Sequence, residues 1–392
     1  MPYISKRSNR FLRITSFGEE SYMCAIRIRG VAKPVRIHIA AWKVAFLCVA
    51  AIATSGYGSS VGSGVTVPLT MFTRVHPAMG TDFTLYIYCG SASDADTMAE
   101  AVFDEVDRMD QLLSNYRDSS ELSRINRNAA TEPVTTDPEM LRFLERSAHW
   151  SSVSHGGFDI TVGRLMKAWG FYRHSGRVPP AEELEQLRAA TGWEKVELDQ
   201  QERTVRFKAP GVELDPGGIG KGFAVDAVVR LLKAQHVRSA MISAGGSTIY
   251  GLGAPPGLAG WRVAVPGPLP LQTTLSTVTL RDMSLSSADC SQKNFTIGGH
   301  LYCHIMDPRT MQPVEGRVQV TILSPSATAS DALSNVLFVE KPQESARILA
   351  AYAPDSRALV VFGGADKRSP RHCMTFRWGW PVNPAHCDVS RL

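Results

Sequence analysis

The chain has 392 residues, of which 44% are hydrophobic and 20% are charged. This composition is typical of a globular protein with a large core, in roughly one to three domains. The formal net charge is only +5, and part of this excess lies in the first 43 residues, so the charge gives no support for a nucleic-acid-binding protein.

The N-terminal segment is basic and then apolar. Lys43 precedes the stretch VAFLCVAAIATSGYGSS, whose apolar run is too short to span a bilayer, and Ala51-Ile52-Ala53 fits the A-x-A cleavage pattern. We therefore expect residues 1–53 to be a secretory signal and the protein to be periplasmic, with this segment able to hold it at the inner membrane. The segment before Lys43 is long for a signal, which makes Met23 a second candidate start. An amphipathic or buried N-terminal helix is the alternative.

The cysteines leave the redox state open. Removal of residues 1–53 would leave five of the seven cysteines, and these have no C-x-x-C spacing, which argues against a cysteine-based metal cluster. Cys373 and Cys387 could form a disulfide in an oxidising periplasm, although spacing alone does not bring their Cα atoms within reach.

Organised sequence begins after a Gly/Ser-rich linker at 54–71. The stretch FTLYIYC at 83–89 predicts a strand, and the apolar periodicity of 94–114 predicts an amphipathic helix. Residues 115–126 are polar and turn-like. A second helix is expected from Pro138 to Val153.

The remaining elements alternate irregularly between strand and helix patterns. We therefore expect an α+β fold with mainly antiparallel sheet, rather than a doubly wound one. The catalytic domain is expected at 72–365, with a C-terminal tail at 366–392. Strands are predicted at 204–209, 239–244, 261–266, 276–280, 318–323 and 358–363, and helices at 181–190, 220–235 and 342–353.

A glycine-rich turn opens the helix predicted at 220–235. Residues 213–232 read ELDPGGIGKGFAVDAVVRLL. Glycine lets the backbone approach a phosphate closely, and a helix N-terminus presents free N–H groups. The stretch lacks the P-loop spacing, because Gly222 stands where Ser or Thr would follow Lys221, and it also lacks G-x-G-x-x-G. The alternative is a plain tight turn with a solvated lysine.

The stretch SDALSN suggests a cation site. Asp331 and Asn335 are four residues apart, so on a helix they share a face and can offer two oxygens to one hard cation such as Mg²⁺. Alternatively, Asp331 caps a helix and Asn335 faces solvent.

Six stretches in order resemble the FAD:protein FMN transferase family, often called ApbE-like. They are AMGTDFTLYI (78–87), GGFDITVGRLMKAWGF (156–171), ELDPGGIGKGFAVD (213–226), ISAGGSTIYGLG (242–253), YCHIMDPRT (302–310) and SDALSNVLF (330–338). The resemblance implies a two-lobed, T-fold-like flavin transferase that takes FAD as substrate. With Mg²⁺ it would transfer FMN to a threonine hydroxyl of an acceptor protein, a protein flavinylation, and release AMP. Hydrolysis of FAD to FMN and AMP, or FAD binding without turnover, are the alternatives.

The resemblance also assigns residues around the flavin nucleotide. It implies that the backbone carbonyl of Gly218 joins Asp331 and Asn335 at the metal, and that Lys221 supplies positive charge to the diphosphate during catalysis. Asp215 instead stabilises a turn in the alternative interpretation, and Met79 and Phe158 belong to the core. The expected FAD contacts are Met79, Tyr116, Gly157, Phe158, Asp159, Asp215, Lys221 and Ile305.

His304 is the expected general base. Attack by a threonine hydroxyl needs a proton acceptor near neutral pH, and imidazole titrates there. A lone histidine beside apolar residues is otherwise a structural group. Asp307 either orients His304 or caps the following turn.

The chain departs from the family pattern at three places. Ser286-Ser287-Ala288-Asp289-Cys290 replaces a Thr-Ser-Gly-Asp-Tyr-like segment, so a glycine and an aromatic residue are missing. Met311 stands where glycine is usual, and Asn335 where threonine or serine is usual. These departures are compatible with a diverged or weakened enzyme.

Overall fold

The computed structural model describes residues 68–172, 176–267, 274–290, 293–363 and 371–391. The predicted signal at 1–53 and almost all of the predicted linker lie outside these residues. Among the described helices, none is long and apolar enough to cross a membrane.

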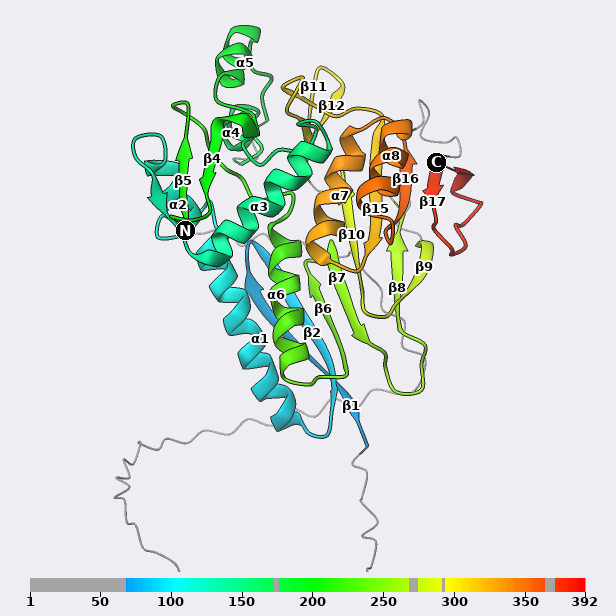
Figure 1. The fold of residues 1–392 in the computed structure, drawn as a ribbon. Helices are drawn as coiled ribbons and strands as arrows, with labels where there is room; N and C mark the ends of the chain where they lie inside the picture. The colour runs from blue at the N-terminus through cyan, green and yellow to red at the C-terminus, as the bar shows by residue number, and fades with distance from the viewer. Residues whose placement is uncertain (1–67, 173–175, 268–273, 291–292, 364–370, 392) are drawn as a thin grey trace, which may run out of the picture. The chain divides into compact units, whose positions relative to one another are not determined.

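A nine-stranded sheet forms the centre of the described chain (Figure 1). Its strand order is β1-β2-β6-β7-β10-β15-β16-β17-β18, and every neighbouring pair is antiparallel except β17 and β18. The strands are β1 (Thr70–Ala78), β2 (Thr81–Cys89), β6 (Ser239–Ala244), β7 (Thr248–Gly253), β10 (Met283–Asp289), β15 (Arg317–Ser324), β16 (Arg357–Phe362), β17 (Arg371–Phe376) and β18 (Cys387–Arg391).

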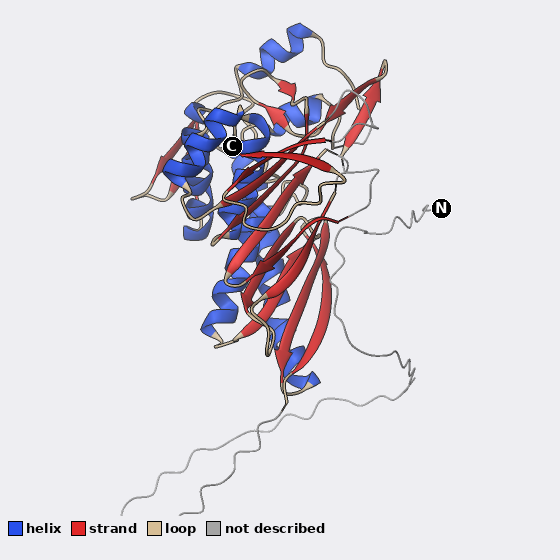
Figure 2. Cartoon of the chain, turned by 90° about the vertical axis from the view of Figure 1, so that its right-hand side faces the viewer, coloured by secondary structure: helices blue, strands red, loops and turns tan. Residues whose placement is uncertain are grey.

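Helices cover one face of this sheet, as Figure 2 shows. They are α1 (Ala92–Leu113), α6 (Gly220–Ala234), α7 (Ala327–Val339) and α8 (Pro342–Tyr352). Alternate residues of β2, including Phe83 and Leu85, point into the same buried cluster as Val228 of α6 and Leu333 of α7. This burial of apolar surface is the main contribution to the stability of the layer.

The opposite face is covered by a hairpin and the C-terminal segment. Strands β8 (Trp261–Pro266) and β9 (Thr274–Leu280) pair with each other, and Trp261 and Leu280 join a second buried cluster. Trp378 and the disulfide between Cys373 and Cys387 belong to the same cluster. The C-terminal strands therefore extend the sheet and close its second face.

Shorter elements form a third region. Helices α2 (Glu121–Asn128), α3 (Pro138–Val153), α4 (Gly163–Ala168) and α5 (Ala181–Arg188) surround a small sheet of β3 (Val134–Thr135), β4 (Val196–Asp199) and β5 (Thr204–Phe207), beside the short helix η1 (Trp193–Lys195). Two hairpins follow β10 in the chain. They are β11 (Asn294–Ile297) with β12 (His300–Cys303), and β13 (Met306–Asp307) with β14 (Gln312–Pro313).

Helices α6 and α7 cap each other. The carboxylate of Asp226 on α6 accepts hydrogen bonds from the backbone N–H groups of Ala327 and Thr328, at 2.8 and 2.9 Å. In return, Asp331 on α7 accepts one from the N–H of Gly222, in the first turn of α6, at 2.9 Å. Both acceptors satisfy N–H groups that a helix start leaves free.

The expected α+β, mainly antiparallel fold is confirmed. The predicted helices at 94–114, 138–153, 181–190, 220–235 and 342–353 correspond to α1, α3, α5, α6 and α8, and the predicted strands to β2, β5, β6, β8, β9, β15 and β16. The turn-like interpretation of 115–126 is wrong in its second half, where α2 begins. Ser120 caps this helix, and Leu122 and Ile125 are its buried apolar side chains.

Candidate functional site

The glycine turn leads directly into α6. Asp215 accepts a hydrogen bond on Oδ1 from the N–H of Gly217 at 2.8 Å, and the carbonyl of Pro216 accepts from Gly220 N at 2.7 Å. A side chain at Gly222 would overlap the carbonyl oxygen of Ala327 on α7. Glycine at this position therefore allows α6 to start directly against α7.

Lys221 is the second residue of α6 and lies partly exposed. Among the described residues, no carboxylate forms an ion pair with it. Its positive charge contributes to the low pKa of His304, so the two side chains act in one electrostatic environment. The α6 N-terminus and Lys221 together favour a negatively charged ligand.

His304 follows β12 and is fixed by the backbone of Lys293. The Lys293 carbonyl oxygen accepts hydrogen bonds from His304 N at 3.1 Å and from Nδ1 at 3.0 Å. Because a carbonyl only accepts, Nδ1 carries the proton in the neutral ring and Nε2 has a free lone pair. Burial, with the charges of Lys293 and Lys221 as further causes, lowers the pKa of His304 to about 4. At neutral pH this imidazole is a neutral proton acceptor.

Two of the three expected metal ligands, Gly218 and Asn335, meet between the glycine turn and α7, and Asp331 lies one turn before Asn335 on that helix. Asn335 Nδ2 lies 3.1 Å from the carbonyl oxygen of Gly218 and 3.1 Å from that of Asp331. The Asp331 carboxylate is 5% exposed and accepts a hydrogen bond from Thr248 Oγ1 at 3.3 Å. The helix-capping alternative holds for Asp331, which caps α6 from α7, whereas Asn335 is half-buried against the turn and does not simply face solvent.

This donor set fits a hard dication. Asp331 offers a carboxylate and Gly218 a carbonyl, and rotation of the Asn335 amide by half a turn presents its oxygen to the same place. Among the described residues, no three His, Cys, Asp or Glu side chains cluster as metal ligands. A cation here would therefore depend on one carboxylate supplemented by neutral oxygens.

Tyr172 is a residue of this site that the sequence analysis missed. Its hydroxyl donates to Asp215 Oδ2 at 2.6 Å and accepts from Asn115 Nδ2 at 2.5 Å. Burial and the nearby Asp215 carboxylate raise the pKa of Tyr172, so the phenol stays protonated. Its ring lies 5.3 Å from that of Tyr116, which is 71% exposed. Tyr172 thus connects two of the expected FAD contacts.

The Gly157–Asp159 segment packs beneath the turn. A side chain at Gly218 would lie 3.0 Å from the Phe158 ring, so Phe158 directly underlies the candidate cation site. Asp159 is 6% exposed and accepts hydrogen bonds from Ser151, Thr161 and the backbone of Trp193. Burial raises the pKa of its carboxyl group. Protein groups therefore supply the hydrogen-bond donors around the Asp159 carboxylate.

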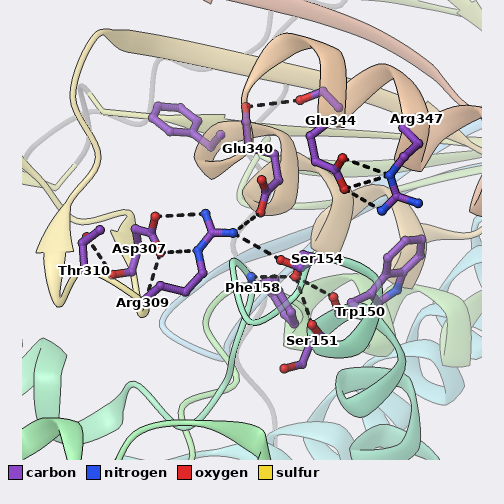
Figure 3. Close-up of polar contacts among 12 residues, drawn as sticks. Trp150, Ser151, Ser154, Phe158, Asp307, Arg309, Thr310, Glu340, Glu344 and Arg347 are labelled. Atoms are coloured by element: carbon purple, nitrogen blue, oxygen red, sulfur yellow. Dashed lines mark hydrogen bonds and ion pairs between the residues drawn. The ribbon is translucent and has the colours of Figure 1, made fainter.

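Arg309 connects this segment to the hairpin that follows His304 (Figure 3). Its guanidinium contacts Asp307 at 2.9 and 3.0 Å, Glu340 at 2.7 Å and the carbonyl of Ser154 at 3.4 Å. A side chain at Gly157 would overlap Glu340. The contacts of Asp307 are with the turn and with Arg309, which is the turn-capping role rather than contact with His304.

Met79 and Ile305 are the remaining apolar candidates. Met79, at the end of β1, has a φ of 50° and comes within 3.8 Å of the position a Gly220 side chain would take. Ile305 is 4% exposed and belongs to the same buried cluster as Phe158 and Ile219. Met79 therefore lies against the turn and is partly accessible, whereas Ile305 is a core residue.

The departures from the family pattern have structural counterparts. Met311 has a φ of 62°, the left-handed region that favours glycine, and its side chain is fully buried beside Trp169. Trp169 Nε1 donates to the Met311 carbonyl at 3.2 Å. Ser286 is buried and bonds Ser330 of α7 at 2.8 Å. Cys290 forms a disulfide with Cys303.

Comparison with known proteins identifies the family. The family profile described as ApbE family matches residues 79–360. The chain belongs to the ApbE family. Relatives named FAD:protein FMN transferase include one from Vibrio cholerae, 30% identical over 272 residues, which are 67% of this chain and 79% of the relative. Another from Treponema pallidum is 29% identical over 313 residues, 76% of this chain and 85% of the relative.

Solved ApbE structures have the same fold. The Flavin Transferase ApbE from Vibrio cholerae superposes with a TM-score of 0.67 at 26% identity, covering 76% of this chain and 96% of that one. The ApbE protein from Thermotoga maritima gives a TM-score of 0.69 at 28% identity, covering 76% and 97%. The α+β arrangement described above is therefore that of the ApbE flavin transferases.

Proposed function

We propose that this ApbE-family enzyme transfers FMN from FAD onto a threonine hydroxyl of an acceptor protein and releases AMP. The observation that supports this most is the arrangement of Lys221, the α6 N-terminus and a neutral His304 around the glycine turn. An anionic diphosphate and a nearby base are what phosphoryl transfer to an alcohol requires.

The proposed reaction breaks one phosphoanhydride bond. The threonine Oγ attacks the phosphorus of the FMN half, and the bond from that phosphorus to the bridging oxygen breaks, so AMP leaves with that oxygen. His304 Nε2 takes the hydroxyl proton, because Nδ1–H is held by Lys293. Lys221 stabilises negative charge on the phosphate oxygens.

Asp331, the Gly218 carbonyl and Asn335 would hold Mg²⁺ beside this diphosphate. When bound, the ion supplies charge compensation on the phosphate oxygens. Asp215 and Tyr116, supported by Tyr172, would contact the nucleotide, and Met79, Gly157, Phe158, Asp159 and Ile305 would shape the surrounding pocket.

We further propose that the enzyme is exported. Both described disulfides, Cys290–Cys303 and Cys373–Cys387, favour an oxidising compartment such as the periplasm. This agrees with the secretory signal expected at 1–53, which would hold the enzyme at the inner membrane only before its cleavage.

Incubation of purified protein with FAD, Mg²⁺ and a threonine-containing acceptor tests the proposed reaction. Transfer produces a fluorescent acceptor and AMP in equal amounts. Free FMN with an unlabelled acceptor would instead mean hydrolysis, and bound intact FAD would mean a binding protein without turnover.

A further inference from the structure

The disulfide between Cys290 and Cys303 lies next to the proposed base. Cys290 directly follows β10 of the central sheet, and its N–H donates to the Val318 carbonyl of β15 at 3.2 Å. Cys303 ends β12 and immediately precedes His304. Their Cα atoms are 5.1 Å apart, and both side chains are buried. The bridge thus ties the residue before His304 to the end of a sheet strand.

The bridged segment also contains the partner of the imidazole. Lys293, whose carbonyl accepts from both His304 N and Nδ1, lies between the two cysteines in sequence. Asn294 Nδ2 donates to the carbonyl of Cys290 at 2.7 Å. One cross-link therefore closes the segment that determines the ring orientation and the tautomer of His304.

The hairpin that carries His304 joins no larger sheet and packs on the rest of the protein through Phe295 against Phe171 and Tyr302 against Trp169. Strands β11 and β12 pair only with each other, and Ile297 and Leu301 are 43% and 53% exposed. An isolated two-stranded hairpin is marginally stable in water. A covalent link removes conformational freedom from the open segment, so it favours the closed arrangement.

We propose that the Cys290–Cys303 disulfide positions His304, so that flavin transfer needs this bridge to be oxidised. The inference rests on the proposed function only in assigning the base role to His304. Cys290 and Cys303 are positioning residues, because they act through Lys293 and His304 and reach no reacting atom. Cys290 stands where the family pattern has an aromatic residue, so this disulfide is a feature of this chain and not of the family pattern.

The redox step needs only thiol chemistry. Oxidation joins the two thiols as a disulfide and passes two electrons and two protons to a small disulfide, which becomes two thiols. In the test, a phosphine reverses this, because the disulfide and one water become two thiols while the phosphine becomes its oxide.

The second disulfide provides a matched control. Cys373 and Cys387 bridge β17 to β18 on the sheet face that β8 and β9 cover. We compare C290S/C303S with C373S/C387S, measuring kcat and KM for AMP release from pH 4 to 8 together with the Kd for FAD. In C290S/C303S we expect kcat to fall about ten- to a hundredfold, within the contribution of a positioned base, and the Kd to change less than threefold.

The pH profile separates positioning from a loss of folded protein. In the bridged enzyme, activity falls on the acid side as His304 becomes protonated, near pH 4. A released His304 gains solvent and its ordinary pKa of about 6.5, so the acid limb of C290S/C303S should move up toward that pH. Loss of folded protein alone would lower the rate at every pH without moving the limb. An unchanged kcat and an unchanged limb would overturn the proposal.

Reduction of a folded protein covers the case in which C290S/C303S does not fold. C373S/C387S retains only the Cys290–Cys303 bridge among the described residues, so phosphine treatment should lower its kcat and re-oxidation should restore it. Full activity after complete reduction would also overturn the proposal. Imidazole nitrogen NMR of the oxidised and reduced protein tests the His304 tautomer directly, without any turnover. A protein that releases no AMP in any state, but loses its Nδ1–H tautomer on reduction, would refute the proposed function and retain the positioning of His304 by the bridge.

Discussion

At the scale of single residues, the site is explained by hydrogen bonds between segments that are distant in sequence. Tyr172 holds Asp215, Lys293 holds His304, and Arg309 joins Asp307 to Glu340. Burial raises the pKa of Glu340, and Arg309 is the charge that opposes this effect. These side chains therefore have protein partners, while Lys221 keeps its charge available for a ligand.

Lys221→Ala should weaken the binding of FAD more than that of riboflavin, because only FAD carries the diphosphate. The loss of one charge-assisted contact predicts a Kd for FAD raised by roughly ten- to a hundredfold. Flavin fluorescence titration measures both ligands, and Lys233→Ala, in the last turn of the same helix, is the control. Equal losses for the two ligands would mean that Lys221 acts through packing.

Tyr172→Phe should also weaken FAD binding. The substitution leaves the ring in place but removes the hydroxyl that bonds Asp215 and Asn115. Asp215 and Asn115 would each lose one hydrogen-bond partner. This predicts a loss of about 1–2 kcal/mol in the free energy of FAD binding, which is about a five- to thirtyfold increase in Kd. Tyr352→Phe, at an exposed position on α8, is the matched control. Wild-type affinity in Tyr172→Phe would show that the orientation of Asp215 does not matter for FAD.

At the scale of elements, the sequence predicted regular segments well and their contacts poorly. The periodicity of α1 and the alternation in β2 follow from local spacing, because each buries one face. Helix α2 was missed because its eight residues contain only two buried apolar side chains. Asp331 and Asn335 were expected to share a face of a helix, and they do on α7. Tyr172 and the longer-range contacts of Arg309 could not be found, because these partners lie 31 to 155 residues away in sequence.

The mutual capping of α6 and α7 predicts a stability effect. Asp226→Ala removes the acceptor for two backbone N–H groups of α7 and for the hydroxyls of Ser326 and Thr328. We expect the free energy of unfolding to fall by about 2 kcal/mol. Urea denaturation measures it, with Asp104→Ala at an exposed position of α1 as the control. A loss no larger than in the control would contradict the capping role.

At the scale of the whole molecule, the cysteines and the N-terminal segment suggest one cellular setting. Four of the five cysteines expected in the mature chain form disulfides, and Cys89 is the free one among the described residues. The sequence analysis considered Cys373 with Cys387 but not Cys290 with Cys303, although their separations of 14 and 13 residues do not distinguish the two pairs. Disulfides persist in oxidising compartments, so the fold itself supports export.

Export makes a direct prediction about the N-terminus. The mature protein should begin near Thr54, because Ala51-Ile52-Ala53 fits the cleavage pattern. N-terminal sequencing of protein recovered from the periplasm checks this. Functional protein in the cytosol that retains residues 1–53 would contradict the proposed location.

The central claim is that α7 and the glycine turn hold the cation while His304 takes the proton. Measuring the rate of AMP release against Mg²⁺ concentration tests both parts in one experiment. Asp331→Ala should lower the rate steeply, with partial recovery at high Mg²⁺, because it removes the site's one carboxylate. Asn335→Thr restores the usual family ligand and should tighten the apparent Mg²⁺ affinity.

His304→Ala should behave differently in the same measurement. We expect its rate to fall by roughly 10²–10⁴ at every Mg²⁺ concentration, with the midpoint of the Mg²⁺ curve unchanged, because the base and the cation site are separate. A wild-type Mg²⁺ curve for Asp331→Ala would contradict the cation site, and a wild-type rate for His304→Ala would contradict the base.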